Sequence, residues 1–270
     1  MTTRRTFLAA PLALALAAGT LAAPAAAAPS SRLIDSHWTG QGSVASVDHS
    51  AWGQFLGSYV RPGPNGVNRV DYAAAKADHQ ALKGYIGMLE QTDPTTLTRD
   101  AAMAYWINLY NAETVDVILD NYPVASIRDI GGGLFSSGPW DEDVVTVNGR
   151  TLSLNDIEHG ILRPIWNDPR IHYAVNCASI GCPNLATQPY TAANLQQMLD
   201  SAAREYVTHP RGAEVTGSGL VVSSIFEWYQ SDFGGTDRGV IDHLASHGAN
   251  VSGQTSIADD RYDWALNDVN

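Results

Sequence analysis

Cysteine is scarce in this sequence. The 270 residues contain two cysteines, Cys177 and Cys182, whereas small scaffolds that depend on disulfides usually need more. The chain is long enough to bury one extensive hydrophobic core. We therefore expect its stability to come mainly from the packing of apolar side chains.

Basic residues are also few. The 16 Lys and Arg residues are outnumbered by 28 Asp and Glu residues, which gives a formal net charge of −12. This balance disfavours nucleic acid and anionic membranes as partners. The acidic residues are spread along the chain, which indicates a solvated surface and not a binding patch.

Residues 1–28 are typical of a twin-arginine signal peptide. Arg4 and Arg5 precede an apolar run, followed by small residues suited to cleavage. The run is broken by Pro11 and Pro24 and is too short for a comfortable membrane span. An uncleaved anchor is the alternative, whereas the lack of a nearby cysteine argues against a lipoprotein signal. We expect export of a folded protein that is secreted or held in the cell envelope and does not contact the membrane after cleavage.

The rest of the chain shows no internal repeat and no convincing linker. Residues 29–49 are polar and predict a flexible lead-in. Residues 50–270 mix helical and strand patterns, which predicts a single α+β domain.

The strongest helical pattern covers residues 98–122. It is apolar almost all round, which predicts a helix buried in the middle of the fold. Asn108 and Asn111 interrupt that apolar surface on one face. Buried amides need partners, so these two either brace neighbouring loops, which we favour, or orient a catalytic group.

Groups able to do chemistry near neutral pH are concentrated in residues 152–185. Residues 143–152 predict a hairpin turning at Asn-Gly, and Ser153 begins a helix that ends before Pro164. Residues 170–176 predict an apolar strand, with Cys177 at its C-terminal end. The loop from Cys177 to Cys182 follows.

Cys177 is the candidate nucleophile, because a thiolate becomes reactive when a neighbouring group stabilises it. In a strand, the odd separation between His172 and Cys177 places them on opposite faces. His159 on the preceding helix is therefore the preferred base. Glu158 points about 100° away from His159 on a helix, so it is not expected to orient that imidazole.

Two alternatives remain open for the cysteines. In an exported protein the pair C-x4-C can close a disulfide, which would remove the free thiol. His159, His172, Cys177 and Cys182 could instead bind a metal, although the sequence shows no supporting pattern for such a site. We expect no cofactor and no metal. The other histidines are expected to be solvated: His37, His49, His79, His209, His243 and His247.

Several blocks, in order, resemble the DUF547 family of uncharacterised domains: AYWINLYNAETVDVIL, LSLNDIEHGILRP, DPRIHYAVNCASIGCPNL, SSIFEWYQSDFGG and YDWALN. The resemblance implies a fold similar to papain-like cysteine peptidases and transglutaminases, with a central buried helix packed on an antiparallel sheet and surrounded by further helices. It assigns site positions to Glu158, His159, His172 and Cys177, and less directly to Asn108, Asn111 and Cys182. In papain-like enzymes the nucleophilic cysteine begins the central helix, whereas Cys177 lies later in this chain.

Two functions are consistent with these residues. The first is a thiol-dependent hydrolase or acyl/γ-glutamyl transferase acting on peptide-like or thiol-peptide substrates outside the cytoplasm. Cys177 would attack a carbonyl, His159 would transfer the proton, and backbone N–H groups of residues 178–181 would stabilise the oxyanion. The second is a non-catalytic binding module that keeps a papain-like cleft, with Cys177 and Cys182 in a disulfide or inert.

Overall fold

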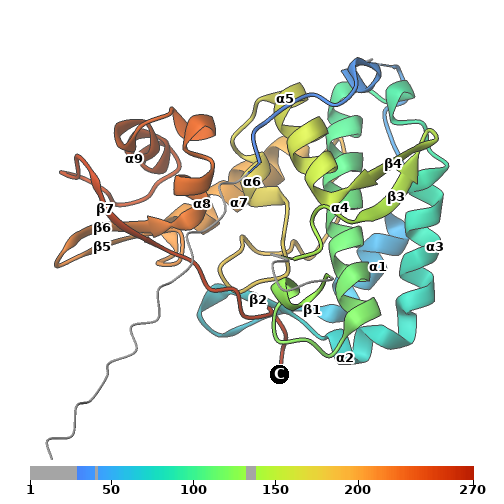
Figure 1. The fold of residues 1–270 in the computed structure, drawn as a ribbon, viewed down its shortest axis with the longest axis horizontal. Coiled ribbons are helices and arrows are strands. Elements are labelled where there is room, and N and C mark those ends of the chain that lie inside the picture. The colour runs from blue at the N-terminus through green and yellow to red at the C-terminus, as the bar shows by residue number, and fades with distance from the viewer. Residues whose placement is uncertain (1–28, 40–41, 132–137) are drawn as a thin grey trace, which may run out of the picture.

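The computed structural model describes residues 29–39, 42–131 and 138–270 (Figure 1). The predicted signal peptide, residues 1–28, lies outside the described residues. Among the described helices, none is both long and apolar enough to cross a membrane. These described residues form many helices and three small sheets, which agrees with the mixed helix-and-strand composition expected from the sequence.

The centre of the fold is helix α4, Arg99–Asn121. Its side chains are buried almost continuously from Ala101 to Val115, which confirms the prediction of a central buried helix. Thr98 occupies the N-cap position, but its side chain makes no capping hydrogen bond. The helix packs against α3, His79–Glu90, and against the segment that carries Glu158 and His159.

The elements around α4 share the larger hydrophobic cluster. They include the helices α1 (Ser50–Tyr59) and α2 (Tyr72–Ala75), the 3-10 turns Ser36–Thr39 and Ile127–Asp129, and the antiparallel strands β1 (Val60–Pro62) and β2 (Asn68–Val70). The 3-10 turns Pro64–Gly66, Lys76–Asp78 and Pro94–Thr96 lie between these elements along the chain.

The predicted hairpin is confirmed. Strands β3 (Asp143–Val147) and β4 (Arg150–Ser153) pair antiparallel. Asn148 and Gly149 turn between them with φ of 49° and 74°, which is the left-handed geometry that Asn-Gly favours in two-residue hairpins. The Ser153 hydroxyl then accepts from the Asp156 N–H at 3.1 Å, and the Ser153 N–H donates to the Asp156 carboxylate at 3.0 Å. These reciprocal bonds start the next helical segment.

A second hydrophobic cluster surrounds a three-stranded sheet. Figure 1 shows this sheet and α9 away from α4, on the opposite side of the view from α3. The elements here are α7 (Leu195–Thr208), β5 (Ala213–Thr216), β6 (Gly219–Ser223), α8 (Ser224–Trp228), the 3-10 turn Gln230–Phe233, α9 (Asp237–Ser246) and β7 (Ile257–Arg261).

The sheets differ from the expected single antiparallel sheet beneath the central helix. Strands β6 and β7 run parallel, and the three small sheets are separate from one another. Helix α4 contacts β3 of the hairpin but otherwise packs mainly on helical segments. The central helix is therefore covered mostly by helices.

The predicted strand over residues 170–176 is wrong, because the chain forms a short helix, α6, Ile171–Ala174. The Ile171 N–H donates to the Asp168 carbonyl at 3.1 Å, so the turn at Asp168-Pro169 continues directly into helical bonding. A short apolar run that is buried on all sides has no periodicity to separate a strand from a helix.

The predicted lead-in makes specific contacts with the rest of the fold. The Ile34 N–H donates to the Gly160 carbonyl at 3.1 Å. Trp38 is buried edge-to-face against Trp106, with ring centroids 5.2 Å apart. A Cβ at Gly160 would lie 2.7 Å from an Ile34 methyl group, so glycine allows this close approach.

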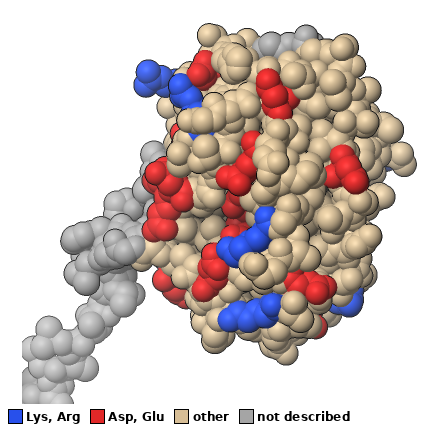
Figure 2. Space-filling model, turned by 90° about the vertical axis from the view of Figure 1, so that its right-hand side faces the viewer, with Lys and Arg blue, Asp and Glu red and all other residues tan. Residues whose placement is uncertain are grey.

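Figure 2 shows one charged face of the molecule, seen from the side of Figure 1 that carries α3. Asp and Glu side chains outnumber Lys and Arg there. They occur singly or in small groups among uncharged residues. This distribution agrees with a solvated acidic surface.

Candidate functional site

The two cysteines form a disulfide, Cys177–Cys182, with Cα atoms 6.2 Å apart. Cys182 is 3% exposed, whereas Cys177 is only partly buried. Neither sulfur is a free thiol in this state. The metal hypothesis for His159, His172, Cys177 and Cys182 is therefore wrong for the oxidised chain, because both sulfur ligands are bonded to each other.

The segment leading to Cys177 is held by the central helix. The Asn111 amide donates to the Ala174 carbonyl at 2.9 Å, and its oxygen accepts from the Asn176 N–H at 2.8 Å. Asn108 makes the same pair of bonds to the backbone of Tyr190, at 2.7 and 3.0 Å. Both amides brace loops, which is the favoured alternative of the sequence analysis.

The loop itself is closed by Asn176. The Asn176 amide donates to the Pro183 carbonyl at 2.7 Å, and its oxygen accepts from the Ala178 N–H at 2.9 Å. Ala178 has a φ of 58°, in the left-handed region. A non-glycine residue in this region is conformationally unfavourable, and the hydrogen bonds of Asn176 hold the turn in this conformation.

The hydrogen bonds of the loop already use most of the N–H groups that were predicted to stabilise an oxyanion in residues 178–181. The Ala178 N–H is used by Asn176. The N–H groups of Ile180 and Gly181 donate to the carbonyls of Ala265 and Asp263, at 2.9 and 2.8 Å. Three of the four N–H groups in this range therefore point to other protein atoms.

Tyr262 contacts the Cys177 sulfur of the disulfide. Its hydroxyl lies 3.0 Å from Cys177 Sγ and 3.1 Å from the Ser179 hydroxyl, which is itself 3.4 Å from that sulfur. Burial raises the pKa of Tyr262 well above its usual value, so the hydroxyl keeps its proton as a donor. Two hydroxyl groups thus contact Cys177 Sγ.

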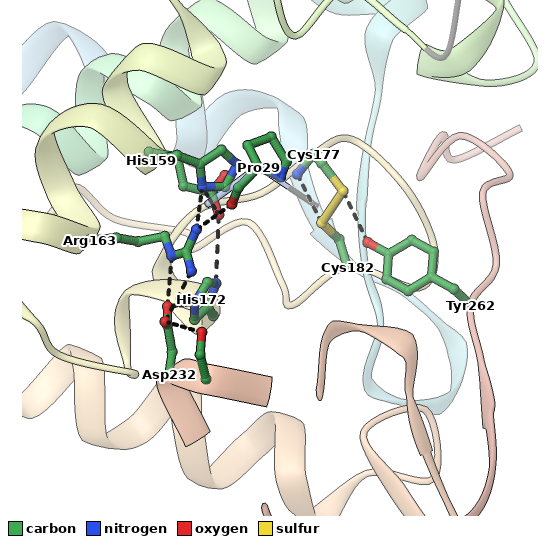
Figure 3. Close-up of polar contacts among 10 residues, drawn as sticks. Pro29, His159, Arg163, His172, Cys177, Cys182, Asp232 and Tyr262 are labelled. Carbon is green, nitrogen blue, oxygen red and sulfur yellow. Dashed lines mark hydrogen bonds and ion pairs between the residues drawn. A yellow bond between two sulfur atoms is a disulfide. The ribbon is translucent and has the colours of Figure 1, made fainter. Parts of the chain in front are cut away.

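A buried cluster of charged side chains forms the second part of the site (Figure 3). Glu158 and His159 lie on a π-helix, Asp156–Leu162, that is followed by α5, Arg163–Trp166. His172 comes from α6, and Asp232 comes from the 3-10 turn before α9.

His172 lies between two carboxylates. Its Nε2–H donates to Asp232 Oδ2 at 2.8 Å, and its Nδ1 is 3.6 Å from Glu158 Oε1. Burial alone would lower the pKa of His172, but the bonds to Asp232 and Glu158 outweigh it and raise this pKa. The imidazole therefore favours its charged form, with Nε2 hydrogen-bonded to Asp232 and Nδ1 within ion-pair distance of Glu158.

Arg163 connects Asp232 to His159. Its Nε and Nη2 donate to the two Asp232 oxygens at 2.6 and 3.0 Å, and its Nη1 donates to the Pro29 carbonyl at 2.9 Å. The same Nη1 lies 3.0 Å from His159 Nδ1. Arginine has no acceptor, so His159 Nδ1 accepts and the ring carries its proton on Nε2.

Charge and burial set opposite protonation states within this cluster. Burial lowers the pKa of His159, which keeps it neutral. Burial would raise the pKa of Glu158, but the neighbouring histidines and Arg163 outweigh it and bring the value to about 2. Burial likewise opposes ionisation of Asp232, yet the bonds from His172 and Arg163 hold its pKa well below the usual value. Both carboxylates are therefore anionic at neutral pH.

The structure brings Glu158, His159 and His172 together but does not bond them to Cys177. The contacts of Cys177 Sγ among the described residues are Cys182, Ser179 and Tyr262. No interaction drawn in Figure 3 joins the disulfide to the charged cluster. The arrangement is a disulfide beside an ion network, and it is not a Cys–His pair poised for attack.

Residues 94–207 match the model of the family described as "Protein of unknown function, DUF547". The match confirms the DUF547 resemblance over this segment, which holds α4, the predicted site residues and both cysteines. No curated protein and no solved structure matches the chain.

Some residues of the site were missed by the sequence reasoning. Arg163 is inside the DUF547 segment, whereas Tyr229, Asp232 and Tyr262 lie outside it. The Tyr229 ring stacks on His172 at 4.4 Å between centroids and lies 4.8 Å from the Arg163 guanidinium carbon. One signal was present, because Arg163 follows His159 by four residues and so shares its helix face.

The remaining histidines are not all solvated as expected. His49 is 5% exposed, and its Nδ1 lies 2.7 Å from the Tyr85 hydroxyl. His79 Nε2 lies 2.7 Å from Asp116, and together with Asp120 these side chains could in principle hold a metal ion. The Lys83 ammonium already bridges both carboxylates at 3.0 and 3.1 Å, so this group is satisfied as an ion-pair network.

Proposed function

We propose that the oxidised chain is an extracytoplasmic binding module for peptide-like ligands, without acyl-transfer catalysis. The observation that carries this proposal is the Cys177–Cys182 disulfide, because a sulfur in a disulfide cannot attack a carbonyl as a thiolate. The proposed base is also engaged, since His159 accepts a bond from Arg163. Export by the twin-arginine pathway and a papain-like relation are parts of the same proposal, the latter supported by the central buried helix.

An aromatic surface beside the disulfide suggests where a peptide binds. Tyr262, which contacts Cys177, lies 4.9 Å from the Trp228 ring and 4.6 Å from the Trp264 ring. All three are partly exposed. Rigid aromatic rings give large contact areas at a low cost in conformational entropy. The exposed Arg128 guanidinium lies 5.3 Å from the Trp264 ring centre and is a suitable donor to a peptide carboxylate.

Titration with S-methylglutathione, a tripeptide derivative without a free thiol, tests the proposal by tryptophan fluorescence. We expect a saturable signal that weakens at least about tenfold in Arg128→Ala, which corresponds to about 1.4 kcal/mol. Arg99→Ala is the matched control, because Arg99 stacks on Trp166 in the same way, at 5.5 Å. A signal that does not saturate, or that falls equally in both variants, contradicts this peptide site.

A thiol-dependent hydrolase or transferase is the second candidate, and it applies to the reduced chain. The Tyr262 and Ser179 hydroxyls near Cys177 Sγ favour it, because such donors stabilise a thiolate. After reduction, alkylation of Cys177 should proceed at pH 5 to 6 and slow in His159→Ala. Equal rates in wild type and His159→Ala, with an ordinary thiol pH profile, would exclude His159 as the activating base.

A further inference from the structure

The two sulfurs of the disulfide differ in access. Cys177 is partly exposed, whereas Cys182 is 3% exposed. In thiol–disulfide exchange a thiolate attacks one sulfur, and the other sulfur leaves. Cys177 is thus the more accessible residue of the pair, which favours it over Cys182 as the point of attack by a small thiolate.

The sulfur that would leave already has a hydrogen-bond donor. The Cys177 backbone N–H donates to Cys182 Sγ at 2.9 Å. A donor aimed at sulfur stabilises the thiolate that forms when the disulfide opens, and a more stable leaving thiolate leaves faster. On the other side, the Tyr262 hydroxyl at 3.0 Å can stabilise a thiolate on Cys177.

The loop is held by bonds that do not depend on the disulfide. The Asn176 side-chain amide donates to the Pro183 carbonyl at 2.7 Å, and these two residues flank the cysteine pair in the sequence. Gly181 donates to Asp263 at 2.8 Å and accepts from the Tyr206 hydroxyl at 2.7 Å. Reduction therefore leaves the two cysteines close together, which is the condition for the disulfide to form again.

We propose that Cys177–Cys182 is a redox-active disulfide that exchanges with small thiols, with Cys177 as the attacked sulfur and Cys182 as the leaving and resolving sulfur. It shares its site with the proposed peptide-binding function but does not depend on that binding. The exchange would convert the oxidised chain into the form with a free Cys177.

The reaction balances in two steps. A thiolate RS⁻ bonds to Cys177 Sγ, the Cys177–Cys182 bond breaks, and its electron pair goes to Cys182 as a thiolate. A second RS⁻ then attacks the R sulfur of the mixed disulfide, which releases RSSR and the Cys177 thiolate. The two protons lost by the two RSH molecules are taken up by the cysteines, so the protein disulfide is reduced and the small thiol is oxidised.

Trapping of the mixed disulfide tests the assigned roles. Cys182→Ser keeps Cys177 but removes the resolving sulfur, so oxidised glutathione should leave one stably bound glutathione on Cys177, visible in the intact mass. Cys177→Ser is the matched variant, and its buried Cys182 should stay unmodified in the folded protein. Equal labelling of both variants, or labelling of Cys182 alone, overturns the assignment.

The reduction rate of the disulfide in the wild-type chain gives a second test, which does not depend on whether a variant folds. We expect dithiothreitol to reduce the native disulfide within about tenfold of its rate for the same chain in urea. If the native disulfide is reduced at least about a hundredfold more slowly than the disulfide of the chain in urea, reduction requires unfolding and the disulfide is purely structural. Dithiothreitol is not a peptide, and S-methylglutathione has no thiol, so failure of exchange and failure of binding are seen separately.

Tyr262 is a positioning residue in this scheme. Tyr262→Phe removes its hydroxyl and keeps its ring, so in the Cys182→Ser background it should raise the pH at which Cys177 is alkylated. Trp228 packs on the same ring, and Trp228→Phe should leave that pH profile in place. An unchanged profile in Tyr262→Phe rules out the role of the hydroxyl.

Discussion

Replacement of Arg163 by Met is expected to destabilise the fold more than the loss of any surface ion pair. Arg163 is 5% exposed and donates to both Asp232 oxygens, to the Pro29 carbonyl and to His159. Met fills similar space but leaves Asp232 with His172 as its remaining partner in the cluster. Removal of one member of a buried ion pair costs about 3–5 kcal/mol, and the partial exposure of Asp232 places this case near the lower value.

Urea and thermal unfolding would measure this effect. About 3 kcal/mol corresponds to a fall in Tm of roughly 6–12 °C for a chain of this size. Arg238→Met is the matched control, because Arg238 pairs with Asp242 on α9 with both side chains more than half exposed, and such pairs contribute about 0–1 kcal/mol. If Arg163→Met and Arg238→Met unfold within about 1 kcal/mol of each other, the ion cluster does not stabilise the fold as argued.

Three further predictions follow from single contacts. Burial lowers the pKa of His49 from 6.5 to about 4, so as the pH falls the unfolded chain binds the proton before the folded chain does. The free energy of unfolding should therefore fall by up to roughly 3 kcal/mol between pH 6.5 and about 4. Urea titrations at each pH measure this, and an equally steep fall in His49→Gln would refute it. Gly181→Ala places a Cβ 2.8 Å from the Asp263 nitrogen, so unfolding should show a loss of about 1–3 kcal/mol, whereas Gly84→Ala, with open space around it, should not lose stability. Asn111→Ala should cost about 2–3 kcal/mol because two backbone groups lose their partner; a loss no larger than in the exposed Asn121→Ala would show that Asn111 does not brace the loop.

The central helix could be predicted because its pattern had one physical meaning. Residues 98–122 are apolar almost all round, and only burial at the centre of a fold satisfies such a helix. The hairpin was equally determined, since Asn148-Gly149 favours the left-handed turn that joins two strands. Local chemistry fixed both elements.

The segment before Cys177 could not be assigned in the same way. Residues 171–174 are buried on all sides, so their apolar character fits a strand or a helix equally well. The argument that His172 and Cys177 lie on opposite faces depended on a strand, because side chains alternate between faces only in strands. It does not apply to the helix that forms here. Tertiary bonds from Asn111 and the turn at Asp168 decide the conformation.

The charged cluster depends on contacts that sequence patterns do not record. Asp232 lies 60 residues after His172 and reaches it only when the second hydrophobic cluster folds against α6. In the sequence, Asp232 stands in a turn-like stretch before two glycines. Sequence spacing likewise left the disulfide of Cys177 and Cys182 open, because five residues of separation suit either a closed loop or two free thiols.

The most direct test of this account is the state of the two cysteines in the purified, folded protein. Alkylation without reductant, followed by peptide mapping, should leave Cys177 and Cys182 unlabelled and recover their peptides as one linked species. Dithiothreitol and the alkylating reagent, added together to the folded protein, should then label the more accessible Cys177 before the buried Cys182. Free labelling of Cys177 before any reductant would contradict the disulfide on which both the binding and the exchange proposals rest.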